Sequence, residues 1–229
     1  MKPFLTCNWE NLLYINYEID PELVVPFLPE DIEPALFGGK TSISLVSFEF
    51  SHAKFLGCKI PFHQFFPEIN LRMYVQRKDN PALQGVYFIS EMVPKIMTVL
   101  VAKYIFGEAF SLQKIRQNKT SNFLQYQCAT EQLHLNFSVN FKENLQLMPT
   151  DLQHFIIEKE FAFCGKKGGK SKLFQVVHQK WNLYQTENPK ISIKKMTNIP
   201  EVFQKIICSQ APISVFATDG SFVEVFNLN

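Results

Sequence analysis

The sequence predicts an α+β fold, in which a largely antiparallel sheet curls or closes into a barrel and helices are few. Strand-type alternation recurs along the whole chain of 229 residues, and the helix signals are few and interspersed among the strands. No low-complexity segment, internal repeat or linker divides the chain. Barrels of this length commonly form one unit, so we expect residues 1–229 to be a single domain.

The clearest strand signal is Leu133–Phe141, which alternates apolar and polar residues without a break. A period of two indicates one buried face and one wetter face. Thr41–Phe50 alternates less cleanly. The same reading predicts further strands over Leu12–Ile19, Gly85–Ser90, Phe123–Cys128, Ile213–Ala217 and Phe222–Phe226.

Helices are predicted from their end signals. Asp20 followed by Pro21 and Glu22 gives an N-cap, a proline at the first helical position and an acid near the positive end of the helix dipole. Thr150–Gln153 is a capping box that opens a helix through about Lys159. Two further helices are expected over Pro94–Phe106 and Pro200–Cys208.

Composition restricts the class of protein. Aromatic residues make up 14% of the chain, with 23 phenylalanines, and this excludes intrinsic disorder. A net charge of +2 argues against a nucleic-acid partner. The five scattered cysteines form no C-x-x-C pair, and no signal peptide is recognisable, so we expect reduced thiols in the cytoplasm. No apolar stretch is long enough to span a bilayer, so no membrane partner is expected.

The segment Phe66–Val75 is the most informative for function. As a strand, it would place Ile69, Leu71, Met73 and Val75 on one face, and a row of polar side chains on the other: Glu68, Asn70, Arg72 and Tyr74. Inside a barrel, this row would line a pocket, where Arg72 could clamp a carboxylate and Glu68 could transfer a proton. The alternative is a solvent-exposed face that carries an ordinary ion pair.

Other motifs give weaker signals. The basic segment Cys164–Ser171 lacks the first glycine of a P-loop, and a hairpin tip between two strands explains it better. His178 and Trp181, three residues apart, could point into one cavity, although structural packing of the two rings is the simpler account. No motif for a metal, a dinucleotide or a serine nucleophile is present, so no cofactor is expected.

Several of these segments, in this order, resemble the YqjF-like family of uncharacterised proteins, which belongs to the acetoacetate-decarboxylase-like superfamily. The match covers nearly the whole chain, and its most specific motif is FPE-x-N-x-R at Phe66–Arg72. The other matching stretches are Trp9–Tyr17, Asp20–Pro29, Gly85–Phe88, Ala102–Gly107, the H-x-x-W-x-L of Val177–Leu183 and a closing hairpin over Pro212–Val225. The resemblance implies a cone-like barrel with outer helices and a cavity reached by the polar face of the Glu68 strand.

One departure from the superfamily bears on activity. The decarboxylases carry a Pro-Lys-Lys soon after the helix that ends near Gly107, and one of those lysines forms a Schiff base with the substrate ketone. Here Phe110 and Ser111 stand at about that place, and Lys114 is out of register. The sequence therefore predicts that this protein is not a Schiff-base acetoacetate decarboxylase.

Two hypotheses follow. In the first, the barrel holds a small molecule, with an anionic or carbonyl group as one option. Glu68 then acts as acid or base, Asn70 and Arg72 bind the ligand, and Tyr74, His178 and Trp181 form walls. In the second, side chains fill the barrel of a structural or protein-interaction module, and Glu68 and Arg72 form a buried ion pair whose truncation costs about 3–5 kcal/mol. Assembly into a homo-oligomer stays open.

Overall fold

In the computed structural model, the described residues are 1–95, 110–130, 133–147, 149–196 and 199–229. Their strands are β1 Leu5–Ile19, β2 Ile32–Pro34, β3 Thr41–Phe55, β4 Cys58–Lys59, β5 Phe66–Arg77, β6 Gln84–Val93, β7 Phe110–Leu112, β8 Ile115–Thr120, β9 Phe123–Ala129, β10 Leu133–Leu147, β11 Phe161–Cys164, β12 Lys172–His178, β13 Leu183–Met196 and β14 Ser214–Asn227. Their helices are α1 Pro21–Val24, the 3₁₀ turn η1 Val25–Phe27, α3 Asp151–Ile157 and α4 Glu201–Ser209. The helix expected over Pro94–Phe106 falls largely outside these residues.

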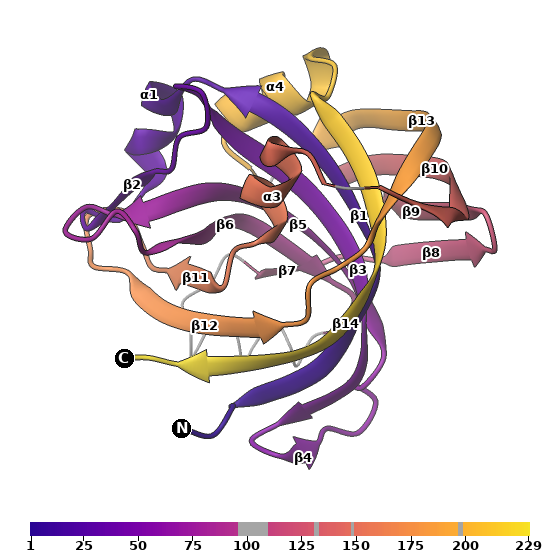
Figure 1. The fold of residues 1–229 in the computed structure, drawn as a ribbon, viewed down its shortest axis with the longest axis horizontal. Coiled ribbons are helices and arrows are strands. Elements are labelled where there is room, and N and C mark those ends of the chain that lie inside the picture. Colours follow the sequence, from indigo (N-terminus) through magenta and orange to yellow (C-terminus); the bar gives the residue numbers. More distant parts are fainter. Residues whose placement is uncertain (96–109, 131–132, 148, 197–198) are drawn as a thin grey trace.

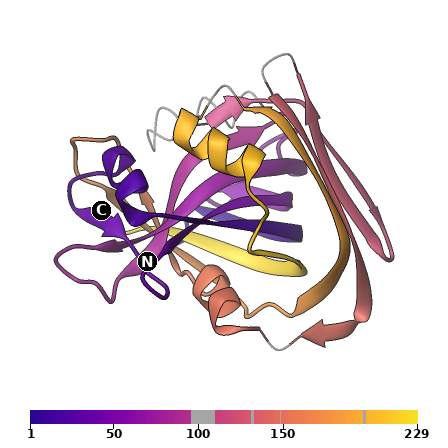
Figure 2. The same ribbon diagram turned by 90° about the horizontal axis from the view of Figure 1, so that it is seen from above.

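Seven of the described strands close into a barrel in the order β1-β3-β5-β6-β11-β12-β14, and β14 pairs back with β1 (Figure 1). The pairs around this ring are antiparallel except β6 with β11, which run parallel. From β14 the sheet continues through β13, β10, β9 and β8. This extension curves beside the barrel, and α4 packs against β13 and β1 (Figure 2). The β-rich barrel with flanking helices confirms the predicted fold class.

Two hydrophobic cores follow from this arrangement. The larger core lies between the barrel wall and the sheet extension, where Ile15 and Leu71 from the barrel join Tyr126 and Phe137 from the extension. Helix α4 contributes Phe203 to it. The second core fills part of the barrel interior and includes Leu12, Tyr14, Val46, Tyr74 and Phe216. Strands β1 and β3 therefore contribute apolar side chains to both cores.

The N-terminus of α3 confirms the capping box predicted from the sequence. The Thr150 hydroxyl accepts a hydrogen bond from the backbone N–H of Gln153, whose side chain accepts one from the Thr150 N–H. The helix ends at Ile157, two residues before the predicted end. Its Phe155 packs on Tyr74 with ring centroids 5.5 Å apart, so α3 covers part of the barrel interior. Among the described residues, no helix is long and apolar enough to cross a membrane.

The end of the chain differs from the prediction. Two strands joined in a closing hairpin were expected, but Ser214–Asn227 forms one continuous strand that runs through Gly220. Gly220 has φ +85°, and a Cβ there would lie 2.0 Å from the carbonyl oxygen of Trp9. The glycine thus marks a close approach of β14 to β1 rather than a turn. By contrast, the basic segment 165–171 does join two antiparallel strands, β11 and β12, as predicted.

Candidate functional site

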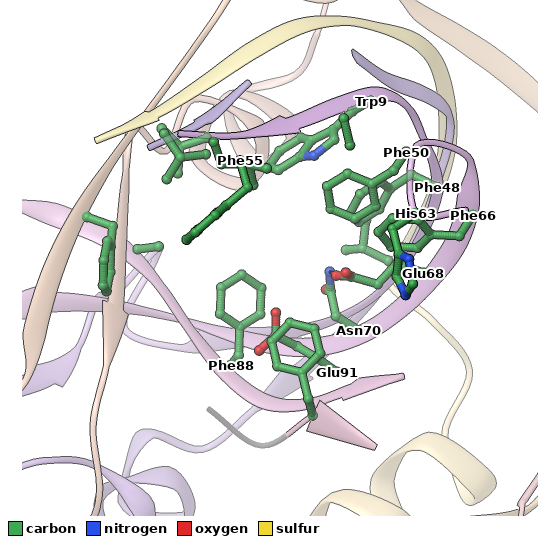
Figure 3. Close-up of a pocket in the computed structure, with 18 of the residues that line it drawn as sticks. Trp9, Phe48, Phe50, Phe55, His63, Phe66, Glu68, Asn70, Phe88 and Glu91 are labelled. Carbon is green, nitrogen blue, oxygen red and sulfur yellow. Dashed lines mark hydrogen bonds between the residues drawn. The ribbon is translucent and has the colours of Figure 1, made fainter. Parts of the chain in front are cut away.

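A cavity of about 240 Å³ lies inside the barrel, beside the β3–β4 hairpin. This volume is several times the roughly 30 Å³ that one water molecule occupies in the liquid. Most of the wall is aromatic, and Figure 3 shows rings from several strands around the space. Phe50 stacks on Phe66 with centroids 4.6 Å apart, and Trp9 lies 5.0 Å from Phe48. The aromatic lining residues are Phe4, Trp9, Phe48, Phe50, Phe55, Phe66, Phe88, Phe110 and Phe174.

A polar stripe on β5 interrupts this aromatic wall. Glu68, Asn70 and Arg72 line the cavity, and they are only 3%, 2% and 7% exposed. The residues between them, Ile69 and Leu71, belong to the larger core between the barrel wall and the sheet extension. The alternation predicted from the sequence is therefore present, but the solvent-exposed alternative for the polar face is wrong because all three side chains are buried. No ion pair joins Glu68 to Arg72 in the described part of the chain.

Glu68 and Asn70 are joined by a direct hydrogen bond. The Asn70 side-chain nitrogen donates to Oε1 of Glu68 at 2.9 Å. Asn70 lies opposite Glu91 in the β5–β6 register, so a second carboxyl group, 4% exposed, lies next to it on the cavity wall. Figure 3 shows Glu68, Asn70 and Glu91 gathered on one side of the cavity. The polar part of the wall is therefore acidic around Asn70.

Glu91 is a site residue that sequence reasoning missed. Phe88 and Glu91 both line the cavity although they are three residues apart, whereas a regular strand would point them to opposite faces. The β5–β6 register shifts between Leu71, opposite Ser90, and Arg72, opposite Phe88. A β-bulge of this kind re-aims the side chains that follow it. No sequence signal marked the bulge, so alternation alone could not place Glu91.

Arg72 lies among aromatic rings rather than acids. Its guanidinium carbon is 5.1 Å from the ring centre of Tyr14 and 5.8 Å from that of Tyr74. Burial opposes the charge, but the two tyrosines offset it and raise the pKa of Arg72, so the side chain stays protonated. Burial also raises the pKa of Tyr14 to about 12, so its hydroxyl is neutral. Among the described residues, no carboxylate lies within salt-bridge distance of Arg72.

Tyr74 lies close to Arg72 but is not among the residues that line the cavity. Its hydroxyl is 2.7 Å from the hydroxyl of Ser44, which donates to Oδ1 of Asn16 at 2.6 Å. Asn16 in turn donates to the hydroxyl of Ser214 at 2.9 Å. Strands β1, β3, β5 and β14 are thus joined by a buried polar network beneath the Arg72 end of the site.

His178 and Trp181 are brought together, but outside the cavity lining. Their rings stack with centroids 4.0 Å apart and an interplanar angle of 12°. His178 donates through Nδ1 to the carbonyl oxygen of Gln179 at 2.8 Å, and Trp181 donates through Nε1 to Ser221 at 2.9 Å. Burial lowers the pKa of His178, and the charge of Arg72 adds to the effect. The pair is thus engaged in local packing.

The three residues near the expected position of the decarboxylase lysines, Phe110, Ser111 and Lys114, differ in whether they reach the cavity. Phe110, on β7, lines the cavity and lies opposite Glu91 of β6. Ser111 is half-buried, and Lys114 is exposed and absent from the cavity lining. Lys54, an exposed residue of β3, is the lysine that does reach the lining among the described residues. Within the same residues, no group of three His, Cys, Asp or Glu side chains is arranged to hold a metal ion.

The closed barrel with its curved extension is an acetoacetate-decarboxylase-like fold. The chain is similar to acetoacetate decarboxylase from Legionella pneumophila, with a TM-score of 0.69 and 14% identity over 97% of this chain and 85% of that one. An acetoacetate decarboxylase-like enzyme from Sphingomonas wittichii RW1 gives 0.68 and 12% over 99% and 92%. The enduracididine biosynthesis enzyme MppR, solved with pyruvate, gives 0.64 and 12% over 98% and 89%. Identities this low show the fold alone.

At the level of sequence, the chain belongs to DUF2071, a family of uncharacterized conserved proteins, whose family model matches residues 6–218. It is also similar to the uncharacterized protein YqjF of Bacillus subtilis (strain 168), with 28% identity over 121 residues. That alignment covers 52% of this chain and 48% of YqjF, so it spans about half the length of that relative.

Proposed function

We propose that this protein binds a small organic molecule in the aromatic cavity and that Arg72 holds the molecule's anionic or carbonyl group. The observation that carries the proposal is a buried guanidinium on the wall of an apolar cavity, with no carboxylate partner among the described residues. A buried charge is costly unless it is paired, so a bound carboxylate would gain a strong hydrogen bond from Arg72.

The remaining polar residues have separate roles in this proposal. Asn70 orients the ligand, and Glu68 is the candidate acid or base if a reaction takes place. Phe110 lines the cavity at about the position where the family resemblance leads one to expect the reactive lysine of the decarboxylases. Since phenylalanine cannot form an imine with a ketone, the proposal includes no such intermediate. Tyr74 supports Arg72 rather than touching the ligand.

The alternative is a structural module in which the polar stripe serves stability. Glu68→Gln separates the two functions because it keeps the size of the side chain and removes its charge. A thermal melt should show a small loss of stability if the carboxyl group belongs to a ligand site. A loss equivalent to several kcal/mol would favour the structural role.

Calorimetric titration with 3-phenylpropionate tests the role of Arg72. This acid combines one aromatic ring with a carboxylate, and 3-phenylpropanol is its uncharged counterpart. We expect the acid to bind more tightly than the alcohol, and Arg72→Met to remove that preference. Arg116→Met is the matched control because Arg116 is exposed on β8 and outside the cavity lining. Equal binding of the acid by wild type and Arg72→Met, both folded, would refute the proposal.

A further inference from the structure

Several buried polar atoms of the cavity-lining residues have no hydrogen-bond partner among the described residues, and two of them lie on the polar stripe of β5: Oδ1 of Asn70 and Nε of Arg72. Their residues are 2% and 7% exposed, and both line the cavity. An amide oxygen only accepts hydrogen bonds, and the guanidinium Nε–H only donates them. Buried polar groups are nearly always paired, so two such atoms at alternate positions of one strand specify what a ligand must offer.

The amide of Asn70 is oriented by its neighbour. The carboxylate of Glu68 accepts the hydrogen bond from Nδ2 of Asn70 at 2.9 Å. When Glu68 is ionised, the reversed amide would place its oxygen against a carboxylate oxygen, where neither atom has a proton to give. Glu68 therefore acts as a positioning residue for Asn70. The Oδ1 atom of Asn70 then accepts no hydrogen bond from the described residues, so a ligand there must supply a hydrogen-bond donor.

The acidic groups also fix which end of a ligand lies where. Glu68 and Glu91 both lie next to Asn70, so a ligand carboxylate at that end would lie beside two carboxyl groups rather than beside a cation. Arg72 is two residues further along β5, about 7 Å from Asn70 along the strand. The anionic group therefore belongs at Arg72 and the neutral donor at Asn70.

We propose that the ligand is an apolar hydroxy acid. Its carboxylate accepts from Nε of Arg72, its hydroxyl donates to Oδ1 of Asn70, and its apolar body packs among Phe48, Phe50 and Phe88. A cavity of about 240 Å³ is smaller than typical sites for drug-sized ligands, which start at about 300 Å³, so a single ring or a short branched chain fits best. This proposal rests on the proposed binding function and adds the hydroxyl requirement.

The test compares acids that differ by one group. Calorimetry measures 3-phenylpropionate against its 2-hydroxy and 3-hydroxy derivatives, on wild type and on Asn70→Leu. On wild type, one hydroxy acid should bind about tenfold more tightly than the parent acid, as expected for a buried hydrogen bond. On Asn70→Leu, this gain should vanish, so that neither hydroxy acid binds more tightly than the parent acid. Glu68→Gln should reduce the gain, because it releases the amide orientation.

A ligand-side control removes the dependence on a folded variant. The methyl ether of the preferred hydroxy acid keeps the oxygen but cannot donate, so wild type should bind it no better than the parent acid. Tight binding of the ether, or a hydroxyl gain that persists in Asn70→Leu, would overturn the inference. If the acids bind through Arg72 but no hydroxyl improves affinity, only this inference fails. If no acid binds, or binding ignores Arg72, the proposed function fails with it.

Discussion

Removing the Ser44 hydroxyl should destabilise the protein strongly, because this small group joins two strands through buried hydrogen bonds. Ser44 is fully buried on β3. It donates its single proton to Asn16, so the Tyr74 hydroxyl must be the donor in the contact between Tyr74 and Ser44. In Ser44→Ala, the side-chain oxygen of Asn16 loses its donor and the hydroxyl of Tyr74 loses its acceptor.

The magnitude follows from these two orphaned groups. Leaving a buried polar group without a partner costs about 1–3 kcal/mol, so Ser44→Ala should lower the free energy of unfolding by about 2–4 kcal/mol after partial relaxation. Ser47→Ala is a matched control on the same strand. Ser47 is also fully buried, but its hydroxyl has no hydrogen-bond partner in the described structure, so its removal should cost almost nothing.

Urea unfolding measures both variants. A lower midpoint with an unchanged slope m reports a loss of stability without a change in the denatured state. Tyr74→Phe should fall between the two variants, at about 1 kcal/mol, because Ser44 keeps its bond to Asn16. If Ser47→Ala costs as much as Ser44→Ala, the hydrogen-bond network is not the source of the stability.

Three further predictions follow from single side chains. Because the pKa of His178 is lowered in the folded protein, the unfolded chain takes up a proton first as the pH falls through about 6.5. The free energy of unfolding therefore decreases below that pH. Between pH 7 and 5, the melting temperature of His178→Phe should fall by less than that of the wild type. Burial against Phe155 lowers the pKa of Lys159 to about 8, so NMR of ¹³C-methylated lysines should show a resonance that titrates near that pH and is absent in Lys159→Arg. Borohydride reduction with acetoacetate should leave Lys114 unmodified in peptide mass spectra, and an adduct there would contradict the prediction that this protein is not a Schiff-base decarboxylase.

Local sequence rules predicted the parts of the fold that depend on neighbouring residues. The capping box at Thr150 predicted α3, and alternation predicted β10 and the two faces of β5. The prediction of a closing hairpin was wrong because the presence of Gly220 in the sequence is compatible with two structures. Glycine permits a turn, but it also permits the close approach of another backbone, and only the position of Trp9 decides between them.

The candidate site was predictable only where it lies on one regular strand. Glu68, Asn70 and Arg72 share a face of β5, and the period of two places them together. Glu91 reaches the same wall through a bulge, and Phe48 reaches it through the β3–β5 register. These depend on pairing between distant segments, which a single strand's pattern does not contain. Whether Tyr74, His178 and Trp181 affect ligand binding from outside the lining stays a prediction.

The pairing of β1 with β14 also sets when the cavity can exist during synthesis. These strands stand at opposite ends of the sequence but lie side by side, and both termini emerge on the same side of the barrel (Figure 1). The ribosome must release β14 before the wall can close, so the aromatic interior stays open to water and to chaperones until then. Contacts so distant in sequence also favour slow folding. A circular permutant that links the ends of β14 and β1 would make this closure local and should fold faster.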